Sequence, residues 1–201
     1  MLRLTDAFAL VGVSVLVCAL MLMLLVSWRA VARGHTALKV LAACCFVVMW
    51  IPVGAAQIPV AAYVRGVTGD ISITLLALAA WHIGYVALAC RSVPQRDNMA
   101  VMAAAAAAAV FLYPLALGWG DWDAYRPGWG SWGMLLVLLA LCTACVAKRL
   151  RLLPALVALA LLGWSMGLME SANLWDYLID PWLAIYALGS CAVFIRSRLF
   201  S

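Results

Sequence analysis

The sequence predicts an all-α, polytopic membrane protein with about seven transmembrane helices. Of its 201 residues, 69% are hydrophobic and 10% are charged, whereas soluble domains are about half apolar and about a quarter charged. The apolar residues form continuous runs instead of alternating with polar ones, which favours spanning helices over barrel strands. No long polar stretch divides these runs, so we expect residues 1–201 to form a single transmembrane helical domain.

Seven apolar segments account for the predicted spans. A helix that crosses the hydrocarbon core needs roughly 20 apolar residues, and most segments meet this length. The fifth is short, and we include it because the topology requires it. The first follows Arg3 as a signal peptide would, but its apolar run exceeds the usual signal core, so we predict a retained helix. The segments are 7–28, 37–60, 71–91, 99–118, 132–147, 152–170 and 174–195.

The basic residues set the predicted orientation. Of the 13 Lys and Arg residues, only Arg3, Arg65 and Arg126 fall on one side of the predicted topology. Short loops rich in Lys and Arg stay in the cytoplasm. The N-terminus is therefore expected outside and the C-terminus in the cytoplasm, which requires an odd number of spans. The residues on the cytoplasmic side are Arg29, Arg33, Lys39, Arg91, Arg96, Lys148, Arg149, Arg151, Arg196 and Arg198.

The acidic residues gather on the opposite, outer side. Only Asp97 falls inside. Acidic residues contribute little to orientation, so their one-sided placement indicates another role. The formal net charge of +5 is explained by the insertion rule and by attraction to anionic lipid, and we expect no nucleic-acid partner. The outer acids are Asp6, Asp70, Asp121, Asp123, Glu170, Asp176 and Asp180.

The loop between spans four and five is rich in aromatic residues. Residues 118–132 contain four Trp, one Tyr, two Asp and one Arg. Trp and Tyr favour the membrane interface, so anchoring is one interpretation. The interleaved Asp121, Asp123 and Arg126 favour a second, in which Trp122, Tyr125 and Trp129 stack on a sugar ring and Arg126 binds phosphate. The sequence leaves both open.

The other outer loops place acids near helix ends. Asp180 precedes Pro181 as an N-cap precedes proline at the first helical position, and Asp70 stands where a cap for the third span belongs. Asp176 and Asp180 share a face if the segment is helical. Glu170 ends span six, where a negative charge is unfavourable without a cation. Arg65 and Arg126 are the cations available there, and Trp175 adds another aromatic surface.

His82 and Gln57 are polar residues in the interior of predicted spans. His82 is near the middle of the third, where an ionisable residue is a functional hypothesis, although a neutral imidazole bonded to a neighbouring helix is the simpler interpretation. Gln57 lies between Pro52 and Pro59, which are expected to kink or interrupt the second span. All seven Cys lie in or beside apolar segments, and we predict packing roles for them, Cys142 and Cys145 included. No metal site is predicted, and no cofactor is indicated.

Three functions fit these features. The first is a cell-envelope protein, in a bacterial inner (cytoplasmic) membrane, that handles a lipid-linked or sugar-bearing substrate at the outer face. The second is an ion-coupled transporter with a cavity reaching Gln57 and His82. The third is a non-catalytic subunit with membrane protein partners. In the first, the site comprises Asp121, Asp123, Glu170, Asp176 and Asp180 as candidate acid, base or metal ligands, with Trp122, Tyr125, Arg126, Trp129 and Trp175 as substrate contacts. No P-loop, nucleophile elbow or H-E-x-x-H motif is present.

Overall fold

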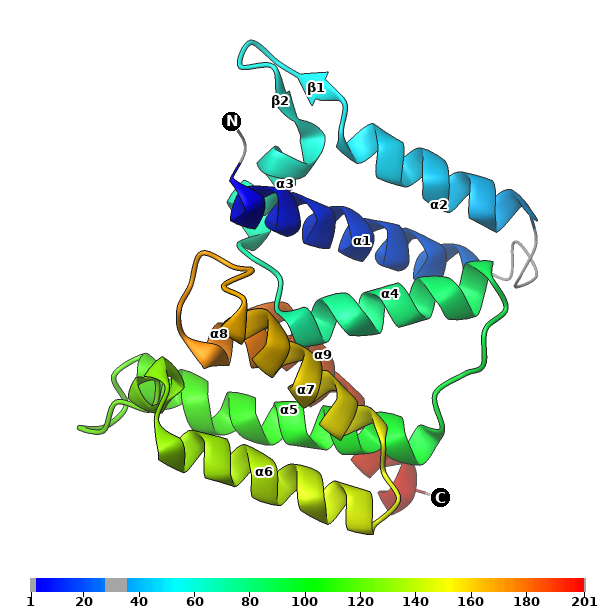
Figure 1. The fold of residues 1–201 in the computed structure, drawn as a ribbon. Coiled ribbons are helices and arrows are strands. Elements are labelled where there is room, and N and C mark those ends of the chain that lie inside the picture. The colour runs from blue at the N-terminus through cyan, green and yellow to red at the C-terminus, as the bar shows by residue number, and fades with distance from the viewer. Residues whose placement is uncertain (1–2, 28–35, 201) are drawn as a thin grey trace. The chain divides into compact units, whose positions relative to one another are not determined.

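The computed structural model describes residues 3–27 and 36–200. Over these ranges the chain forms nine α-helices, one short 3₁₀ helix and a small hairpin (Figure 1), so the all-α fold class is confirmed. The described residues group into two compact units. The N-terminal unit holds residues 3–27, 36–71, 75–92 and 168–170, and the C-terminal unit holds 72–74, 93–167 and 171–200. The single-domain prediction stays a prediction.

The N-terminal unit is built around α1 (Leu4–Ser27). This helix packs against α2 (Thr36–Met49) and against the short α3 (Val60–Thr68) (Figure 1). Most of α4 (Ile73–Ala87) belongs to the same unit. Leu22 of α1, Leu38 of α2 and Val86 of α4 form a buried apolar cluster. This cluster holds together the end of α1, the start of α2 and the end of α4.

The predicted second span, 37–60, is wrong beyond Met49. There α2 ends, and β1 (Pro52–Val53) pairs with β2 (Ile58–Pro59) as an antiparallel hairpin. The physical reason is that proline has no amide hydrogen and disfavours a helical residue before it. Gln57 therefore lies in the exposed hairpin turn, where its Nε2 donates to the Gly54 carbonyl at 3.0 Å.

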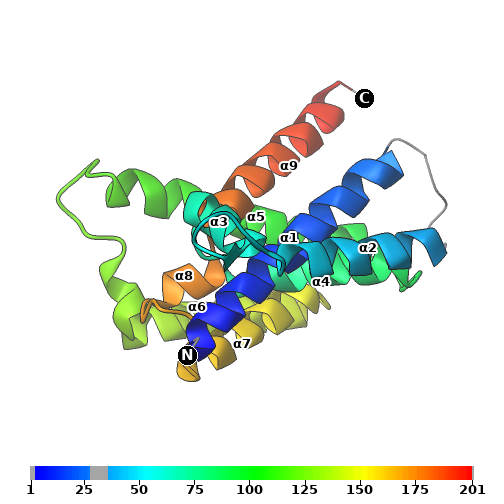
Figure 2. The same cartoon turned by 90° about the horizontal axis from the view of Figure 1, so that it is seen from above.

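The C-terminal unit contains the remaining helices. Helix α7 packs against α5, α6 and α8, and α9 packs along α5 (Figure 2). The interior Pro114 lies near the end of α5. Helix α7 ends at Ser165, just before the left-handed Gly167 (φ +61°), so the predicted sixth span, 152–170, is helical only as far as Ser165. The elements are α5 (Gln95–Ala116), η1 (Arg126–Trp129), α6 (Trp132–Ala147), α7 (Leu152–Ser165), α8 (Leu174–Leu178) and α9 (Pro181–Leu199).

Side chains, one of them from a distant segment, cap two helices of this unit. Asp97, the single acid on the predicted inner side, accepts hydrogen bonds from the backbone N–H groups of Arg151 (2.7 Å) and Leu152 (3.0 Å). It therefore satisfies amides at the start of α7 that have no partner within that helix. Ser131 caps α6 by accepting from Met134 N at 3.2 Å. The inner acid thus has a structural role that ties α5 to α7.

Three described helices are long and apolar enough to cross a membrane, namely α1, α5 and α9. This finding is consistent with an integral membrane protein. The other four apolar helices, α2, α4, α6 and α7, have 14 to 16 residues. At 1.5 Å per residue they are about 21–24 Å long, below the hydrocarbon thickness of about 30 Å.

Candidate functional site

An open hollow of about 430 Å³ lies on the loop between α5 and α6. We call it the aromatic hollow. In Figure 2 the first part of this loop stands clear of the helices, on the left. Trp122 and Trp129 are 52% and 62% exposed there, so their rings are available to a ligand. The exposed Arg126 guanidinium has no ion-pair partner among the described residues. The lining residues are Trp122, Asp123, Arg126, Pro127, Trp129, Gly130 and Ser131.

Local contacts hold this hollow in shape. Asp123 Oδ1 accepts from the backbone N–H groups of Tyr125 (2.9 Å) and Arg126 (3.2 Å), closing a tight turn. Such a turn is typical of Asp, whose side chain reaches its own backbone two residues on. The Trp122 ring lies 5.5 Å from the ring of Phe111 in α5. One carboxylate oxygen of Asp123 is thus engaged with the backbone, and the second is left for a ligand.

A set of hydrogen bonds, which we call the loop clasp, joins this loop to the segment before α9. The Tyr125 hydroxyl donates to the Asp176 carboxylate, which also accepts from the Ser171 hydroxyl. Asn173 Nδ2 donates to the Tyr125 carbonyl at 3.0 Å, and Trp175 Nε1 donates to the Ala124 carbonyl at 3.1 Å. The clasp therefore holds the loop that carries the aromatic hollow against residues 171–176.

Burial and the Asp176 carboxylate act together on the Tyr125 phenol. Burial, the larger cause, and the hydrogen bond to Asp176 both raise the pKa of Tyr125 above its ordinary value of 10.0. The phenol therefore stays protonated at neutral pH and remains a hydrogen-bond donor. Tyr125 is a clasp residue in this structure, and its ring does not line the aromatic hollow.

The clasp depends on two residues that the sequence did not single out. Asn173 is fully buried, and its Oδ1 accepts from Trp175 N at 3.0 Å, so it caps α8. A Cβ atom on Gly128 would lie 1.8 Å from that Oδ1, so only glycine fits there. The available sequence signal was Asn173 as an N-cap, since Asn is favoured at that position. Nothing local in the sequence identifies its contact with Gly128.

Asp180 has the structural role that its neighbour Pro181 predicted. It is 4% exposed, and its Oδ1 accepts from Leu183 N at 2.8 Å at the start of α9. Its Oδ2 accepts from Ser72 N at 2.9 Å. Both oxygens are therefore engaged with backbone amides. The predicted helix cap is confirmed, and α9, which falls in the predicted seventh span, begins at Pro181 after the separate short helix α8.

In the N-terminal unit, Arg65 pairs with three of the acids that were predicted on the outer side. Its Nε lies 2.6 Å from Asp70 Oδ1, its Nη1 lies 3.0 Å from Asp6 Oδ1, and its Nη2 lies 3.4 Å from Glu170 Oε2. Asp70, expected to cap the third span, instead binds Arg65, and α4 begins three residues later at Ile73. The hydrogen bond that Arg65 donates to Asp70 raises the pKa of Arg65 most, and the other two acids add to it. Glu170 thus has Arg65 as its compensating cation.

His82 lies on α4 with its Nε2 buried and without a hydrogen-bond partner among the described residues. The imidazole bond to a neighbouring helix that the sequence suggested is not formed by this atom. Trp50 Nε1, in the same unit, is likewise buried and unpartnered within the described ranges. His82 remains a candidate polar site inside a predicted span.

The structure distributes the predicted site residues over several places. Asp123, Trp122, Arg126 and Trp129 come together in the aromatic hollow, whereas Asp121 is exposed elsewhere in that loop. Tyr125, Trp175 and Asp176 lie in the clasp, Asp180 caps α9, and Glu170 pairs with Arg65. Within residues 3–27 and 36–200, no group of three or more His, Cys, Asp or Glu side chains is placed to hold a metal ion.

Comparison with known proteins adds no family: no family model, no curated protein and no solved structure matches the chain. The functional hypotheses therefore depend on the geometry of the described residues.

Proposed function

We propose that this chain is a seven-span protein of a bacterial inner (cytoplasmic) membrane that binds a lipid-linked or sugar-bearing substrate at its outer face. The proposal adds the four shorter apolar helices to the three long ones, because a bilayer can thin locally around a short span. The N-terminus is then outside and the C-terminus in the cytoplasm. Reporter fusions test this: a reporter active only in the cytoplasm should work after Phe200 and fail when inserted at Gly120.

The aromatic hollow carries the functional proposal. Trp122 and Trp129 offer two exposed ring faces on which an apolar face of a sugar can stack. Between them in sequence lies Arg126, whose planar guanidinium binds phosphate with two parallel hydrogen bonds. The second oxygen of Asp123 is an acceptor for a hydroxyl group. These four side chains line one hollow, and together they match a sugar phosphate head group.

The hydrogen bonds of Asp176 and Asp180 favour a site that binds its substrate over one that hydrolyses it. A general base must reach the proton that it removes, but both oxygens of the buried Asp180 already accept from backbone amides. Asp176 accepts from the Tyr125 and Ser171 hydroxyl groups. Their contacts support a positioning role for these two carboxylates. We therefore propose that the hollow recognises a head group and that the clasp holds it in shape.

The test compares two soluble head-group probes, glucose 1-phosphate and glucose, on the purified protein in nanodiscs. The proposal expects wild type to bind glucose 1-phosphate more tightly than glucose. It expects Arg126→Gln to remove most of that preference, because a guanidinium–phosphate contact is worth about 1.5–3 kcal/mol. Arg126→Lys should keep part of it, since it retains the charge but not the planar pair of donors. Equal binding of both probes by wild type and Arg126→Gln contradicts the proposal.

A second candidate function, an ion-coupled carrier, has one observation in its favour. The buried Nε2 of His82 lacks a partner within the described residues, and an ionisable group inside a predicted span often belongs to an ion pathway. Proton-coupled flux into proteoliposomes that contain wild type or His82→Ala tests it. Loss of flux in the variant supports the carrier, and equal flux in both rejects it.

A further inference from the structure

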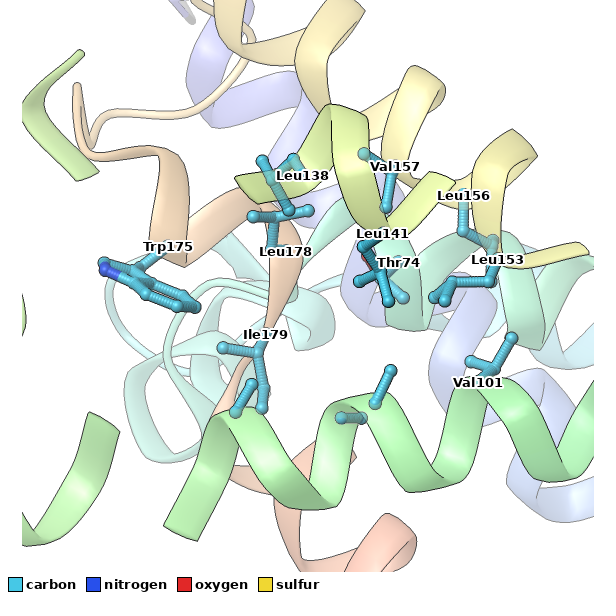
Figure 3. A pocket seen from close by; sticks show the side chains of 13 residues that line it. Thr74, Val101, Leu138, Leu141, Leu153, Leu156, Val157, Trp175, Leu178 and Ile179 are labelled. Carbon is cyan, nitrogen blue, oxygen red and sulfur yellow. The ribbon is translucent and has the colours of Figure 1, made fainter. Parts of the chain in front are cut away.

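A second concavity in the C-terminal unit is apolar. It is lined mainly by helices α5, α6, α7 and α8 and not by the loop between α5 and α6. It has a volume of about 80 Å³ (Figure 3). One wall consists of Ala104, Ala105 and Ala108 of α5, and Leu138 and Leu141 of α6 contribute another. We call it the alanine groove. Its one polar side chain, Thr74, already donates its hydroxyl to the Tyr177 carbonyl at 3.5 Å. The groove therefore presents hydrocarbon and no free polar group.

The small side chains of α5 keep this groove open. Helix α7 packs against both α5 and α6 and supplies further apolar lining. Figure 3 shows the lining side chains pointing toward a common space, with Trp175 at one end and Leu153 and Val101 at the other. Because alanine carries only a methyl group, replacing it by leucine would project a larger side chain into that space.

Trp175 connects the alanine groove to the aromatic hollow. Figure 3 shows its nitrogen on the side away from the other lining side chains, and this nitrogen donates to the Ala124 carbonyl. A Cβ atom on Gly128 would lie 2.7 Å from Trp175 Cδ1. Ala124 and Gly128 belong to the same loop as Asp123 and Arg126, which line the hollow. One indole thus separates the end of the groove from the loop that forms the hollow.

We infer that the alanine groove holds a short stretch of the hydrocarbon chain of the same lipid whose head group lies in the aromatic hollow. This inference rests on the proposed function and narrows its substrate to an amphiphile bound at both ends. A lipid joins a polar head covalently to an apolar chain, and the C-terminal unit has both a polar, aromatic hollow and an apolar groove, linked by the Trp175 indole, which lines the groove and bonds to the loop of the hollow. Burial of methylene groups in the groove adds affinity that a soluble head group lacks.

The experiment uses two photoreactive lipids in nanodiscs, a glycosyl phospholipid and a phosphatidylcholine, each with a diazirine at the middle of the same acyl chain. After irradiation, labelled peptides are mapped by mass spectrometry. We expect the glycosyl probe to label residues 104–108, Leu138 and Leu141. Ala105→Leu should lower this labelling about fivefold or more, since it removes about one kcal/mol or more of chain contact. Ala105→Val is the milder second variant if Ala105→Leu folds poorly.

Ala107→Leu is the matched control. Ala107 lies on the same helix but is exposed and does not line the groove, so labelling should equal that of wild type. Arg126→Gln should lower labelling by the glycosyl probe and leave that by phosphatidylcholine unchanged. If Ala105→Leu does not change labelling while Arg126→Gln still does, the groove inference is overturned and the proposed function stands. If both probes label the groove equally and Arg126→Gln has no effect, the groove takes bulk lipid, which overturns both.

Discussion

The Tyr125 hydroxyl donates a hydrogen bond to the Asp176 carboxylate, joining the loop between α5 and α6 to the short helix α8 across 51 positions of the sequence. Asn173 and Trp175 add two further bonds to the backbone of this loop. The aromatic hollow lies on the same loop. Its shape is therefore set partly by residues that do not line it, and changes in the clasp should alter both stability and head-group binding.

Tyr125→Phe tests the clasp. The substitution removes the hydroxyl donor and keeps the ring, so it should lower the free energy of unfolding by about 1–3 kcal/mol, because a partly buried carboxylate loses a partner. Asp176→Asn should have a smaller effect, since an amide oxygen still accepts. Thermal unfolding in detergent, followed by Trp fluorescence, measures both. A Tyr125→Phe protein as stable as wild type would mean that this bond contributes nothing.

The raised pKa of Tyr125 predicts a loss of stability at alkaline pH. Its folded-state pKa lies above the ordinary value of 10.0, so the stabilisation is complete below about pH 10 and is lost as pH rises through the folded-state pKa. Tyr125→Phe lacks this group and should show a shallower fall in unfolding temperature as the pH rises above about 10. Parallel curves for wild type and the variant would contradict a raised pKa.

Asp180 is expected to matter for stability more than for chemistry. Asp180→Ala leaves the N–H groups of Leu183 and Ser72 without their partner, which should cost about 2–4 kcal/mol from the lost cap and the buried amides. Asp180→Asn retains one acceptor oxygen and should cost about half as much. Denaturant titration measures the difference. An Asp180→Asn protein as stable as wild type would show that the second hydrogen bond is unimportant.

Arg65 should stabilise the N-terminal unit through charge. Arg65→Gln removes the cation shared by Asp6, Asp70 and Glu170, and loss of the Asp70 pair alone should cost about 1 kcal/mol. Arg65→Lys should keep only part of the stability that Arg65→Gln loses, because one ammonium cannot replace the forked guanidinium. The deficit is expected to shrink in about 1 M salt, where the Debye length is about 3 Å. A deficit that is independent of salt would indicate a packing role instead.

The sequence predicted those features that depend on local chemistry. The Asp180–Pro181 cap and the interruption of the second span by Pro52 and Pro59 were both expected, because proline geometry acts within a few residues. The all-α fold followed from composition. The hairpin itself was not predicted, since continuous apolar character does not distinguish a helix from a short strand pair.

The candidate site was less predictable because its contacts are tertiary. Glu170 required a cation, but only the fold brings Arg65 rather than Arg126 to it. The close approach of Gly128 to Asn173 joins residues from two loops, and no spacing rule places them together. Seven spans, their orientation, membrane protein partners and the role of His82 stay predictions.

If the aromatic hollow binds the head group, two tryptophans of the loop between α5 and α6 should differ in their effect on binding. Trp129 lines the hollow, whereas Trp119 is also accessible to solvent, at 76% exposed against 62% for Trp129, but does not line it. The measurement is the dissociation constant of glucose 1-phosphate for wild type, Trp129→Ala and Trp119→Ala in nanodiscs. Loss of a stacking ring should weaken binding about tenfold for Trp129→Ala and leave Trp119→Ala unchanged. Equal constants for the two variants, or no binding by wild type, would contradict the account.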